Sequence, residues 1–347
     1  MFPGPEVPKM VASLTVRPAR AGDLDAAASL FAARHRHDRT RIPHLEPRLE
    51  EPAAARELIR PLFENPRAHG AVAESGGSVA GFLFGEEMLF APSDMASLFI
   101  PPHSISMPIE GHAVAERQDA TDVYRALYGF LASRWVANGF FIHRCAIPPG
   151  DDQVQEAWVS LGFGRYLTAA TRPTSPVERQ NVAAIEVQRA SPEDIDVVAE
   201  LAECLGRWHW QAPMFWPVLH ATDAATREFN LGQLRSGDLP FFVGYQDGTP
   251  TGMQTFLRPG FTPPVVARDG DVYLFEGVVS DGARGGGVGS ALLRHSMDWA
   301  RNAGYESCTL HFAPGNPSGA PFWLGHGFVP VEHTMERRVD ERVAWAR

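Results

Sequence analysis

The sequence has 347 residues, of which 44% are hydrophobic, which is more than one typical domain needs and enough for two hydrophobic cores. Its formal net charge of −10 argues against a nucleic-acid partner, for which a basic face would be expected. The three cysteines, Cys145, Cys204 and Cys308, lie far apart and in no Cys-x-x-Cys pair, so the sequence predicts neither a disulfide framework nor a thiolate zinc site.

No stretch of the chain approaches the roughly 18 apolar residues of a membrane-spanning helix, and residues 1–14 contain no apolar segment of the kind that a signal peptide carries. We therefore expect a soluble, cytoplasmic protein with no membrane partner. His35, His37 and His44 lie close together in the sequence, but no set of carboxylates or cysteines accompanies them. We interpret them as a solvated polar face and predict no metal site.

The first half of the chain opens with a strand that leads into a helix with an acidic start, over residues 14–25. A hairpin follows, in which the apolar segments 70–74 and 79–84 flank a turn of serine and glycine. Residues 171–181 are polar, contain proline and show no hydrophobic period. We therefore place a linker at 173–184, between domains at 1–172 and 185–347.

The second half repeats the first. Residues 185–196 parallel residues 14–25 at a shift of 171 positions, and residues 322–328 parallel residues 157–163 at a shift of 165. The two shifts agree within a short insertion, so the sequence indicates one long duplication rather than a solenoid, whose repeats would be much shorter. In each half we expect strand, helices, hairpin, strand, helix, strand, helix and strand, in that order.

The second half also carries the most informative segment of the chain. After an Asp-Gly hairpin over 239–256, an apolar strand at 272–279 runs into the glycine-rich turn 282–290, and an amphipathic helix begins at Val288. Glycines remove the Cβ atoms that keep an anion away from backbone N–H groups, and the start of the helix points unpaired N–H groups at the same place. The turn is therefore predicted to bind phosphate, although a glycine-rich connection without a ligand is the alternative.

Better-known phosphate loops do not fit this turn. No lysine is present in this region for a P-loop, and no register gives the Gly-x-Gly-x-x-Gly pattern of a dinucleotide-binding loop. The pattern Arg-x-x-Gly-x-Gly, at Arg284, Gly287 and Gly289, resembles motif A of the GNAT acetyltransferase superfamily. The segment 316–328 resembles that superfamily's Asn-x-x-Ala-x-x-Phe-Tyr-x-x-x-Gly-Phe motif, with Gly319 in place of alanine and Trp323 in place of tyrosine.

The resemblance implies an α/β (α+β) fold of two tandem GNAT-like domains, each with a mixed, mostly antiparallel central sheet flanked by helices. It also implies that the strand, the turn and the last helix bind acetyl-CoA as co-substrate. The residues concerned are Gly277, Val278, Val279, Arg284, Gly285, Gly286, Gly287, Val288, Gly289, Ser290 and Asn316. Structural alternatives are an ion pair for Arg284 and a helix cap for Asn316.

Glu276 is the candidate catalytic base, because superfamily members often place a proton-accepting carboxylate on this strand. A structural salt bridge with one of the many arginines is the alternative. Gly277 is expected to let the acetyl group approach closely. The usual tyrosine acid is missing, since the indole of Trp323 cannot transfer a proton at ordinary pH, so Tyr273, His326 or solvent would have to protonate the leaving thiolate.

The first half lacks a second copy of the glycine turn. Its region 111–123 has no glycine after Gly111, and Glu116 and Asp119 stand near the predicted helix start, where a carboxylate repels an anion and occupies the N–H groups. We interpret this half as a degenerate copy that serves structure or acceptor binding. For the acceptor itself, the resemblance points to an aromatic loop, with Trp208, His209, Trp210 and Phe215 as candidates. Packing of this loop against the other domain is the alternative.

These observations predict an acetyl-CoA-dependent N-acetyltransferase that acts on the amine of a small molecule. A non-catalytic acyl-CoA-binding or regulatory protein is the alternative, because Trp323 replaces the usual acid. The sequence does not identify the acceptor or distinguish a monomer from a homodimer.

Overall fold

The computed structural model describes residues 14–116, 119–178, 185–266 and 269–346. The second half shows the predicted order of elements, and the first half shows it with two strands, at 104–107 and 112–114, where one was predicted. In the first half the elements are β1 (Thr15–Pro18), α1 (Leu24–Arg39), α2 (Pro52–Glu64), β2 (Ala68–Ser75), β3 (Ser78–Met88), β4 (Ser104–Met107), β5 (His112–Val114), α3 (Ala120–Ala137), β6 (Ile142–Ile147), α4 (Asp152–Ser160) and β7 (Gly164–Pro173). In the second half they are β8 (Glu186–Arg189), α5 (Ile195–Trp210), α6 (Asp223–Ser236), β9 (Phe241–Gln246), β10 (Thr249–Leu257), β11 (Asp271–Val279), α7 (Val288–Asn302), β12 (Ser307–Phe312), α8 (Gly319–Gly325) and β13 (Val329–Arg338).

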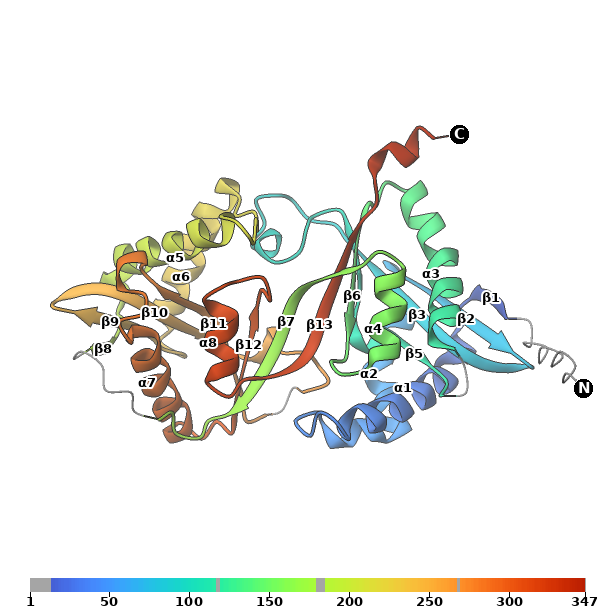
Figure 1. The fold of residues 1–347 in the computed structure, drawn as a ribbon, viewed down its shortest axis with the longest axis horizontal. Coiled ribbons are helices and arrows are strands. Elements are labelled where there is room, and N and C mark those ends of the chain that lie inside the picture. The colour runs from blue at the N-terminus through green and yellow to red at the C-terminus, as the bar shows by residue number, and fades with distance from the viewer. Residues whose placement is uncertain (1–13, 117–118, 179–184, 267–268, 347) are drawn as a thin grey trace, which may run out of the picture.

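All of these strands join one sheet, in the order β1-β2-β3-β4-β6-β13-β7-β12-β11-β10-β9-β8, with β5 paired to β3 (Figure 1). The pairs β4/β6 and β11/β12 are parallel, and the other pairs are antiparallel. The expected mixed, mostly antiparallel α/β fold is therefore confirmed.

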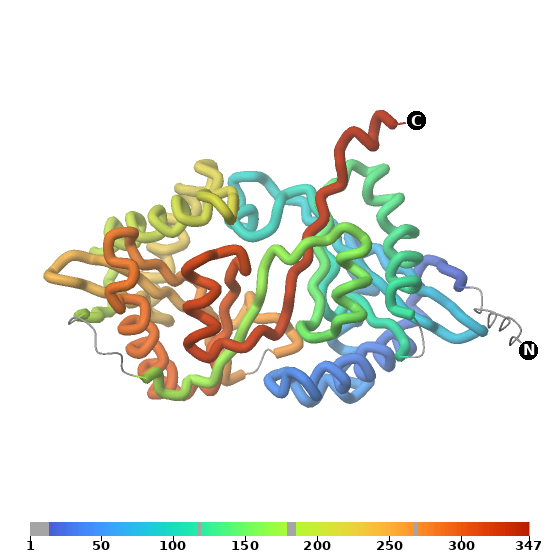
Figure 2. The backbone as a smooth tube through the Cα atoms, viewed as in Figure 1, coloured from blue at the N-terminus to red at the C-terminus, as the bar shows by residue number. Residues whose placement is uncertain are grey.

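The last strand of each half lies in the other half's part of the sheet. Both neighbours of β7, which are β12 and β13, come from the second half, and both neighbours of β13, which are β6 and β7, come from the first. Figure 2 shows β7 in light green and β13 in red beside each other across the middle of the molecule. The division at 173–184 stays a prediction, but the exchange shows that the two halves share a continuous sheet.

Helices cover both faces of each half of the sheet. Successive residues of a strand point to opposite faces, and Val72 packs with α1 and α2 whereas Ala71 and Ala73 pack with α3 and α4. In the second half, Phe241 and Val243 face α5 and α6, and Phe242 faces α7 and α8. The result is a three-layer arrangement with a hydrophobic core on each side of the sheet.

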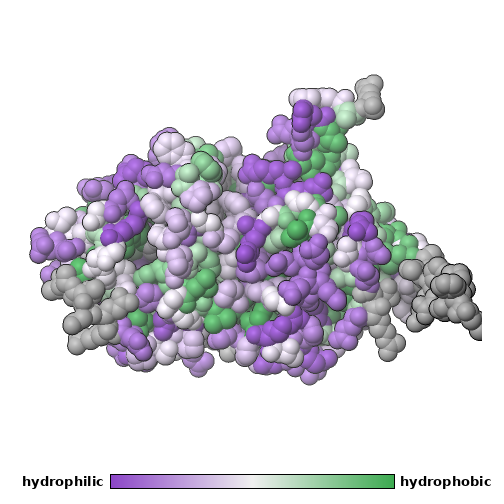
Figure 3. Space-filling view, viewed as in Figure 1, coloured by the Kyte–Doolittle hydropathy of each residue, from purple (hydrophilic) through white to green (hydrophobic). Residues whose placement is uncertain are grey.

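The outer surface is mostly polar. Figure 3 shows mainly hydrophilic residues on one face of the molecule, with hydrophobic residues in small separate patches. No helix in the described ranges is both long enough and apolar enough to span a membrane.

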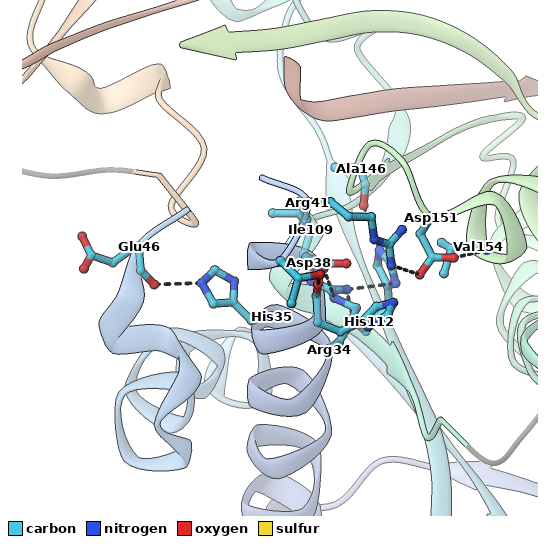
Figure 4. Close-up of polar contacts among 12 residues, drawn as sticks. Arg34, His35, Asp38, Arg41, Glu46, Ile109, His112, Ala146, Asp151 and Val154 are labelled. Atoms are coloured by element: carbon cyan, nitrogen blue, oxygen red, sulfur yellow. Dashed lines mark hydrogen bonds and ion pairs between the residues drawn. The ribbon is translucent and has the colours of Figure 1, made fainter. Parts of the chain in front are cut away.

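The predicted solvated face at the histidine-rich start of the chain is present only in part, because His37 is exposed whereas His35 is not. His35 is buried on α1, where its Nε2 lies 2.8 Å from the carbonyl oxygen of Glu46 (Figure 4). Its neighbour Arg34 is buried as well and donates to the carbonyl oxygens of Ile109 and His112. The polar residues of this helix therefore face the sheet as well as solvent, because backbone acceptors there satisfy their donors.

Candidate active site

A cavity of about 1670 Å³ lies between the two halves and is lined by both. The second half contributes β11, the glycine turn, the start of α7 and the end of α5. The first half contributes the segment before β4 and parts of β4, β6 and β7. Because β13 also reaches the cavity, the exchanged strands form the part of its wall where the two halves meet.

The cavity opens where β11 separates from β12. Their parallel pairing runs from Asp271 opposite Ser307 to Tyr273 opposite Thr309. Residues 274–279 continue in the sheet, but among the described strands they pair only with β10. One edge of this segment is therefore free to hydrogen-bond an extended ligand that carries amide groups, as strand edges do when they bind peptides. Gly277, Val278 and Val279 all line the cavity here.

The glycine turn has the backbone of an anion site. Gly285 and Gly287 have φ values of 80° and 86°, which favour glycine. Helix α7 begins at Val288 with Gly287 as its N-cap, and no side chain caps it. A Cβ on Gly285 would meet no described atom within 4 Å, so the turn faces open space. The N–H groups of the first turn of α7 are thus available to a phosphate, and the residues fit the pyrophosphate of acetyl-CoA.

Most of the residues predicted to bind the cofactor line this one cavity: Gly277, Val278, Val279, Arg284, Gly285, Gly287, Val288, Gly289, Ser290 and Asn316. Gly286 is not among the lining residues. Its N–H donates to the carbonyl oxygen of Ala283 at 3.2 Å, and a Cβ there would lie 3.1 Å from the same oxygen. Gly286 therefore shapes the turn instead of facing the cavity.

Arg284 and Asn316 both contact Trp208. The Arg284 guanidinium lies 3.6 Å from the centre of the Trp208 ring and forms a 2.7 Å ion pair with Asp281. Asn316 Oδ1 accepts hydrogen bonds from Trp208 Nε1 at 3.2 Å and from the N–H of Gly319, at the start of α8, at 2.9 Å. The structural roles foreseen for Arg284 and Asn316 are therefore present, at positions that also face the cavity.

Glu276 lies on the open segment of β11, and its environment is that of a base. Its nearest polar partner is Thr255, whose Oγ1 donates to the carboxylate at 3.5 Å and accepts from the Glu276 N–H at 3.2 Å. Burial raises the pKa of Glu276 to about 7. It forms no ion pair with any described residue, so the alternative of a structural salt bridge is not observed. A carboxylate with a pKa near neutral pH can accept a proton from an ammonium group.

Trp323 packs against the backbone of β11. A Cβ on Gly277 would lie 2.9 Å from the Trp323 ring. Gly277 therefore provides space, as expected, but the tryptophan ring fills it instead of an acetyl group. This contact explains why glycine is required at 277 and places the indole in the wall of the cavity.

Two other groups that could protonate a thiolate line the cavity. Tyr273 has its hydroxyl 2.8 Å from His311 Nδ1, and burial raises the pKa of the phenol above its ordinary value, which keeps it protonated. His326 has Nε2 3.1 Å from the Ser290 hydroxyl and Nδ1 2.7 Å from the carbonyl oxygen of Phe322. The geometry keeps both residues as candidates.

The predicted aromatic loop is in part helical: Trp208, His209 and Trp210 end helix α5, and only Phe215 of the four lies in the loop that follows. Trp208, His209 and Trp210 line the cavity, whereas Phe215 is 71% exposed and does not. Trp216 was not among the predicted site residues, although it is next to Phe215 in the same aromatic run. Its Nε1 donates to the carbonyl oxygen of Leu98 at 3.0 Å, and its ring lies 5.0 Å from that of Tyr166. The loop thus contacts the first half as well as the cavity.

The equivalent opening in the first half is filled by side chains. His112 on β5 lies with Nε2 2.8 Å from the carbonyl oxygen of Ala146 on β6, and with Nδ1 2.7 Å from the hydroxyl of Tyr124. Trp158 packs 5.1 Å from the Tyr124 ring, and all three side chains are fully buried. At the start of α3, the Asp119 carboxylate accepts from the N–H of Thr121 at 2.8 Å. Both the cleft and the helix N–H groups are therefore occupied.

Buried titratable groups should give the stability a maximum near neutral pH. Burial lowers the pKa of seven histidines: to about 3 for His112, to about 4 for His35, His143, His209, His311 and His333, and below its ordinary value for His295. Their unfolded pKa is near 6.5, so stability is lost as pH falls through 6.5 toward 4. Burial raises the pKa of Glu110 and Glu276 to about 7 and of Glu332 to about 8, so stability also falls as pH rises toward 8.

We expect the midpoint temperature of thermal unfolding to be highest at roughly pH 6.5. Below this pH protonation of the histidines lowers the stability, and above it ionisation of the glutamates does so. Scanning calorimetry across pH 4.5 to 9 measures it. A midpoint that keeps rising above pH 8 would contradict the burial of the three glutamates as carboxylic acids.

Comparison with known proteins agrees with the site. Residues 198–328 match the acetyltransferase (GNAT) family. A GCN5-related N-acetyltransferase from Sphaerobacter thermophilus aligns over 94% of this chain and 95% of its own, with a TM-score of 0.60 and 14% identity. The GCN5-related glucosamine N-acetyltransferase region of a fungal multi-domain GH3 β-N-acetylglucosaminidase aligns over 94% of this chain and 38% of that one, with a TM-score of 0.57 and 12% identity.

No match was found among curated protein sequences. The two structural relatives share the fold at identities too low to transfer a substrate. The family match begins within α5 and runs past the end of α8, with the glycine turn between them, and the structural similarity extends over both halves. Residues 198–328 therefore match the acetyltransferase (GNAT) family, and the fold over both halves is similar to that of a GCN5-related N-acetyltransferase.

Proposed function

We propose that this protein is an acetyl-CoA-dependent N-acetyltransferase that acetylates the amine of a small molecule, with the chemistry in its second half. The observation that carries the proposal is the half-buried Glu276 carboxylate on the open segment of β11, in the same cavity as the uncapped start of α7. A base and an anion site in one cavity are what acetyl transfer from acetyl-CoA to an amine requires.

The cavity has room for acetyl-CoA in an extended pose. The glycine turn and the first N–H groups of α7 would hold the pyrophosphate. The free edge of residues 274–279 would pair with the amides of the pantetheine arm. A backbone N–H on this edge would then polarise the thioester carbonyl and stabilise the negative charge that develops on its oxygen.

The nitrogen must lose two protons, and sulfur must gain one. Glu276 takes the first proton from the ammonium of the acceptor, and the freed lone pair of the nitrogen attacks the carbonyl carbon of the thioester. The carbon–sulfur bond then breaks and the electron pair leaves with sulfur, which is protonated by Tyr273, His326 or solvent, while the nitrogen releases its second proton to solvent as the amide forms. Since burial brings the pKa of Glu276 to about 7, a useful fraction is ionised at neutral pH.

A non-catalytic acyl-CoA-binding protein is the second candidate, and Trp323 at the position of the usual tyrosine favours it. A panel of amines, assayed for acetyl-CoA-dependent release of thiol, separates the two. Release with at least one amine supports the enzyme, whereas tight acetyl-CoA binding without release across the panel supports the binding protein.

One acetyl-CoA is expected to bind per chain. The second half offers an open strand edge and an uncapped helix start, whereas His112, Tyr124 and Trp158 fill the equivalent space in the first. Isothermal titration of the full chain with acetyl-CoA measures the ratio. Two equivalent sites would mean that the first half is a working copy after all.

A further inference from the structure

The cavity contains more unpaired carboxyl groups than the transfer reaction uses. The four arginines that line it each have a carboxylate partner: Arg144 with Glu336, Arg207 with Glu203, Arg227 with Asp196 and Arg284 with Asp281, at 2.6 to 2.8 Å. Three lining glutamates, Glu110, Glu276 and Glu332, have no ion-pair partner among the described residues. Glu276 is the proposed base, so Glu110 and Glu332 need another explanation.

Glu332 is a buried carboxylate without a partner. It lies on the exchanged strand β13, opposite Ala169 of β7, and is only 8% exposed. It lines the cavity, and its side chain forms no hydrogen bond or ion pair with any residue in the described ranges. A carboxylate kept in this state costs free energy unless a positive group accompanies it.

Glu110 adds a second carboxylate at the same end of the cavity. It lies in the short turn Ile109–Gly111 between β4 and β5, and its Oε2 is buried with no hydrogen-bond partner in the described structure. Ile109 and Val331, the neighbours of the two glutamates in sequence, belong to one core cluster. Glu110 raises the pKa of Glu332, as expected of two nearby negative charges.

The nearest cation is already engaged. Arg34 lowers the pKa of both glutamates, but its guanidinium lies 3.4 Å from Asp38 and donates to the carbonyl oxygens of Ile109 and His112 (Figure 4). Arg34 therefore does not pair with either carboxylate. Within the described residues there is also no group of three potential metal ligands, which disfavours a metal ion as the missing charge.

A cluster of aromatic side chains lines the cavity beside Glu276. Phe275, next to Glu276, has its ring 5.5 Å from that of Phe99 in the first half, and Phe261 lies 5.9 Å from both rings. All three line the cavity. In the sheet, β13 is three strands from β11, which is roughly 14 Å at the usual strand spacing. A cavity with an apolar wall and carboxyl groups on separated strands suits a ligand with an apolar spacer between two cations.

We propose that the acceptor is a small amine with two separated cationic groups, of which one is acetylated beside Glu276 and the other is held by Glu110 and Glu332. This inference rests on the proposed function for the reacting amine, but the second cation site stands on its own contacts. The exchanged strand thereby gains a role, because Glu110 and Glu332 come from different halves of the chain and both line the cavity, where β13 lies beside β6.

The test compares two ligands that differ in one terminal group, α,ω-diaminooctane and ω-aminooctanol. Isothermal titration without acetyl-CoA measures their affinities for the full chain at low ionic strength. The diamine is expected to bind at least roughly ten-fold more tightly. In Glu332→Gln, and more strongly in the double variant that adds Glu110→Gln, this preference should fall to about two-fold, the statistical factor for two equivalent ends.

Glu203→Gln is the matched control. It removes one carboxylate at the exposed rim of the same cavity, where Glu203 pairs with Arg207, and should keep the preference for the diamine. Glu332→Gln should melt no lower than the parent protein, because it removes a buried charge without changing shape. Equal binding of the two ligands by the parent, or a preference that survives the double variant, would overturn the proposal.

The experiments give different results if the proposed transferase function is wrong and if the proposed cation site is wrong. If no amine, including the diamine, supports release of thiol from acetyl-CoA, the proposed function fails. The cation site would still be established by a diamine preference that Glu332→Gln removes. Conversely, thiol release with simple monoamines and no diamine preference would support the enzyme and reject the site.

Discussion

Replacing Glu276 with glutamine is expected to lower turnover by roughly two to four orders of magnitude, the usual value of general base catalysis. Glutamine keeps the size of the side chain and can still contact Thr255, but it cannot accept a proton. Acetyl-CoA affinity should change little, because Glu276 lies on β11 and not in the glycine turn. Steady-state rates of thiol release, together with titration of acetyl-CoA, measure both quantities.

The pH profile separates a base from a structural residue. For the parent protein, kcat/KM should rise with pH through about 7, because the Glu276 carboxylate is active only when ionised and burial places its pKa there. In Glu276→Gln this inflection should disappear, leaving the ionisation of the acceptor amine, so the deficit shrinks as pH rises. Glu203→Gln, on the rim of the cavity, should keep both the rate and the profile. Near-normal turnover of Glu276→Gln at neutral pH would make Glu276 structural.

The second half was predictable because its signals are local. A turn with Gly285 and Gly287 at positive φ needs glycine whatever surrounds it, and the apolar positions of α7 repeat with the helical period. Likewise, the buried face of α7, with Leu292, Leu293 and Met297, packs in the core as its spacing indicates. Local chemistry also explained the first half, since Asp119 caps α3 and withholds the N–H groups that an anion would need.

The strand exchange could not be predicted in this way. The sequence of β13 suits any antiparallel neighbour, because alternation of side chains sets only which face is buried and not which strand lies alongside. The duplication indicated that each half would use its own last strand, whereas β7 and β13 each lie between strands of the other half. Pairing between strands that are about half the chain apart depends on the whole assembly.

Because the strand exchange was not predicted, Glu110 and Glu332 were not predicted as site residues. Glu110 lies in the sequence of an ordinary turn, and Glu332 lies among polar residues of the last strand. Neither therefore differs locally from a solvated glutamate. A signal for Glu110 was nevertheless present, because it precedes Glu276 by 166 residues, within the range of shifts that relates the halves. Comparing the halves for retained charge, and not only for lost glycines, would have found it.

The role of the aromatic segment could be predicted only in part. Its composition indicated a site or an interface, and the structure divides it accordingly: Trp208 faces the cavity and Trp216 contacts the first half. Nothing in the sequence indicated that the Trp208 ring would stack on Arg284. A ligand in the glycine turn must share Arg284 with this ring, which links the predicted acceptor loop to the predicted phosphate ligand.

Replacing Gly287 with aspartate is expected to weaken acetyl-CoA binding by at least roughly a hundred-fold, because it puts a negative charge at the N-cap of α7, where the pyrophosphate would lie. Asparagine at the same position is the matched control. Asparagine and aspartate have nearly the same shape, both tolerate positive φ and both serve as helix N-caps, so the pair isolates the charge. The asparagine variant should lose affinity only about ten-fold, through the added side chain.

Two further measurements locate the effect at the phosphates. Both variants should unfold within a few degrees of the parent protein, because an N-cap side chain offsets part of the strain at φ 86°. S-acetylpantetheine, which has the thioester and the amide arm but no pyrophosphate, should bind equally to the aspartate and asparagine variants, since its contacts lie along residues 274–279 of β11. If the two variants also bind acetyl-CoA equally, then charge at the start of α7 does not matter to the ligand. The glycine turn would in that case serve only to connect β11 to α7, and the pyrophosphate would have to bind elsewhere.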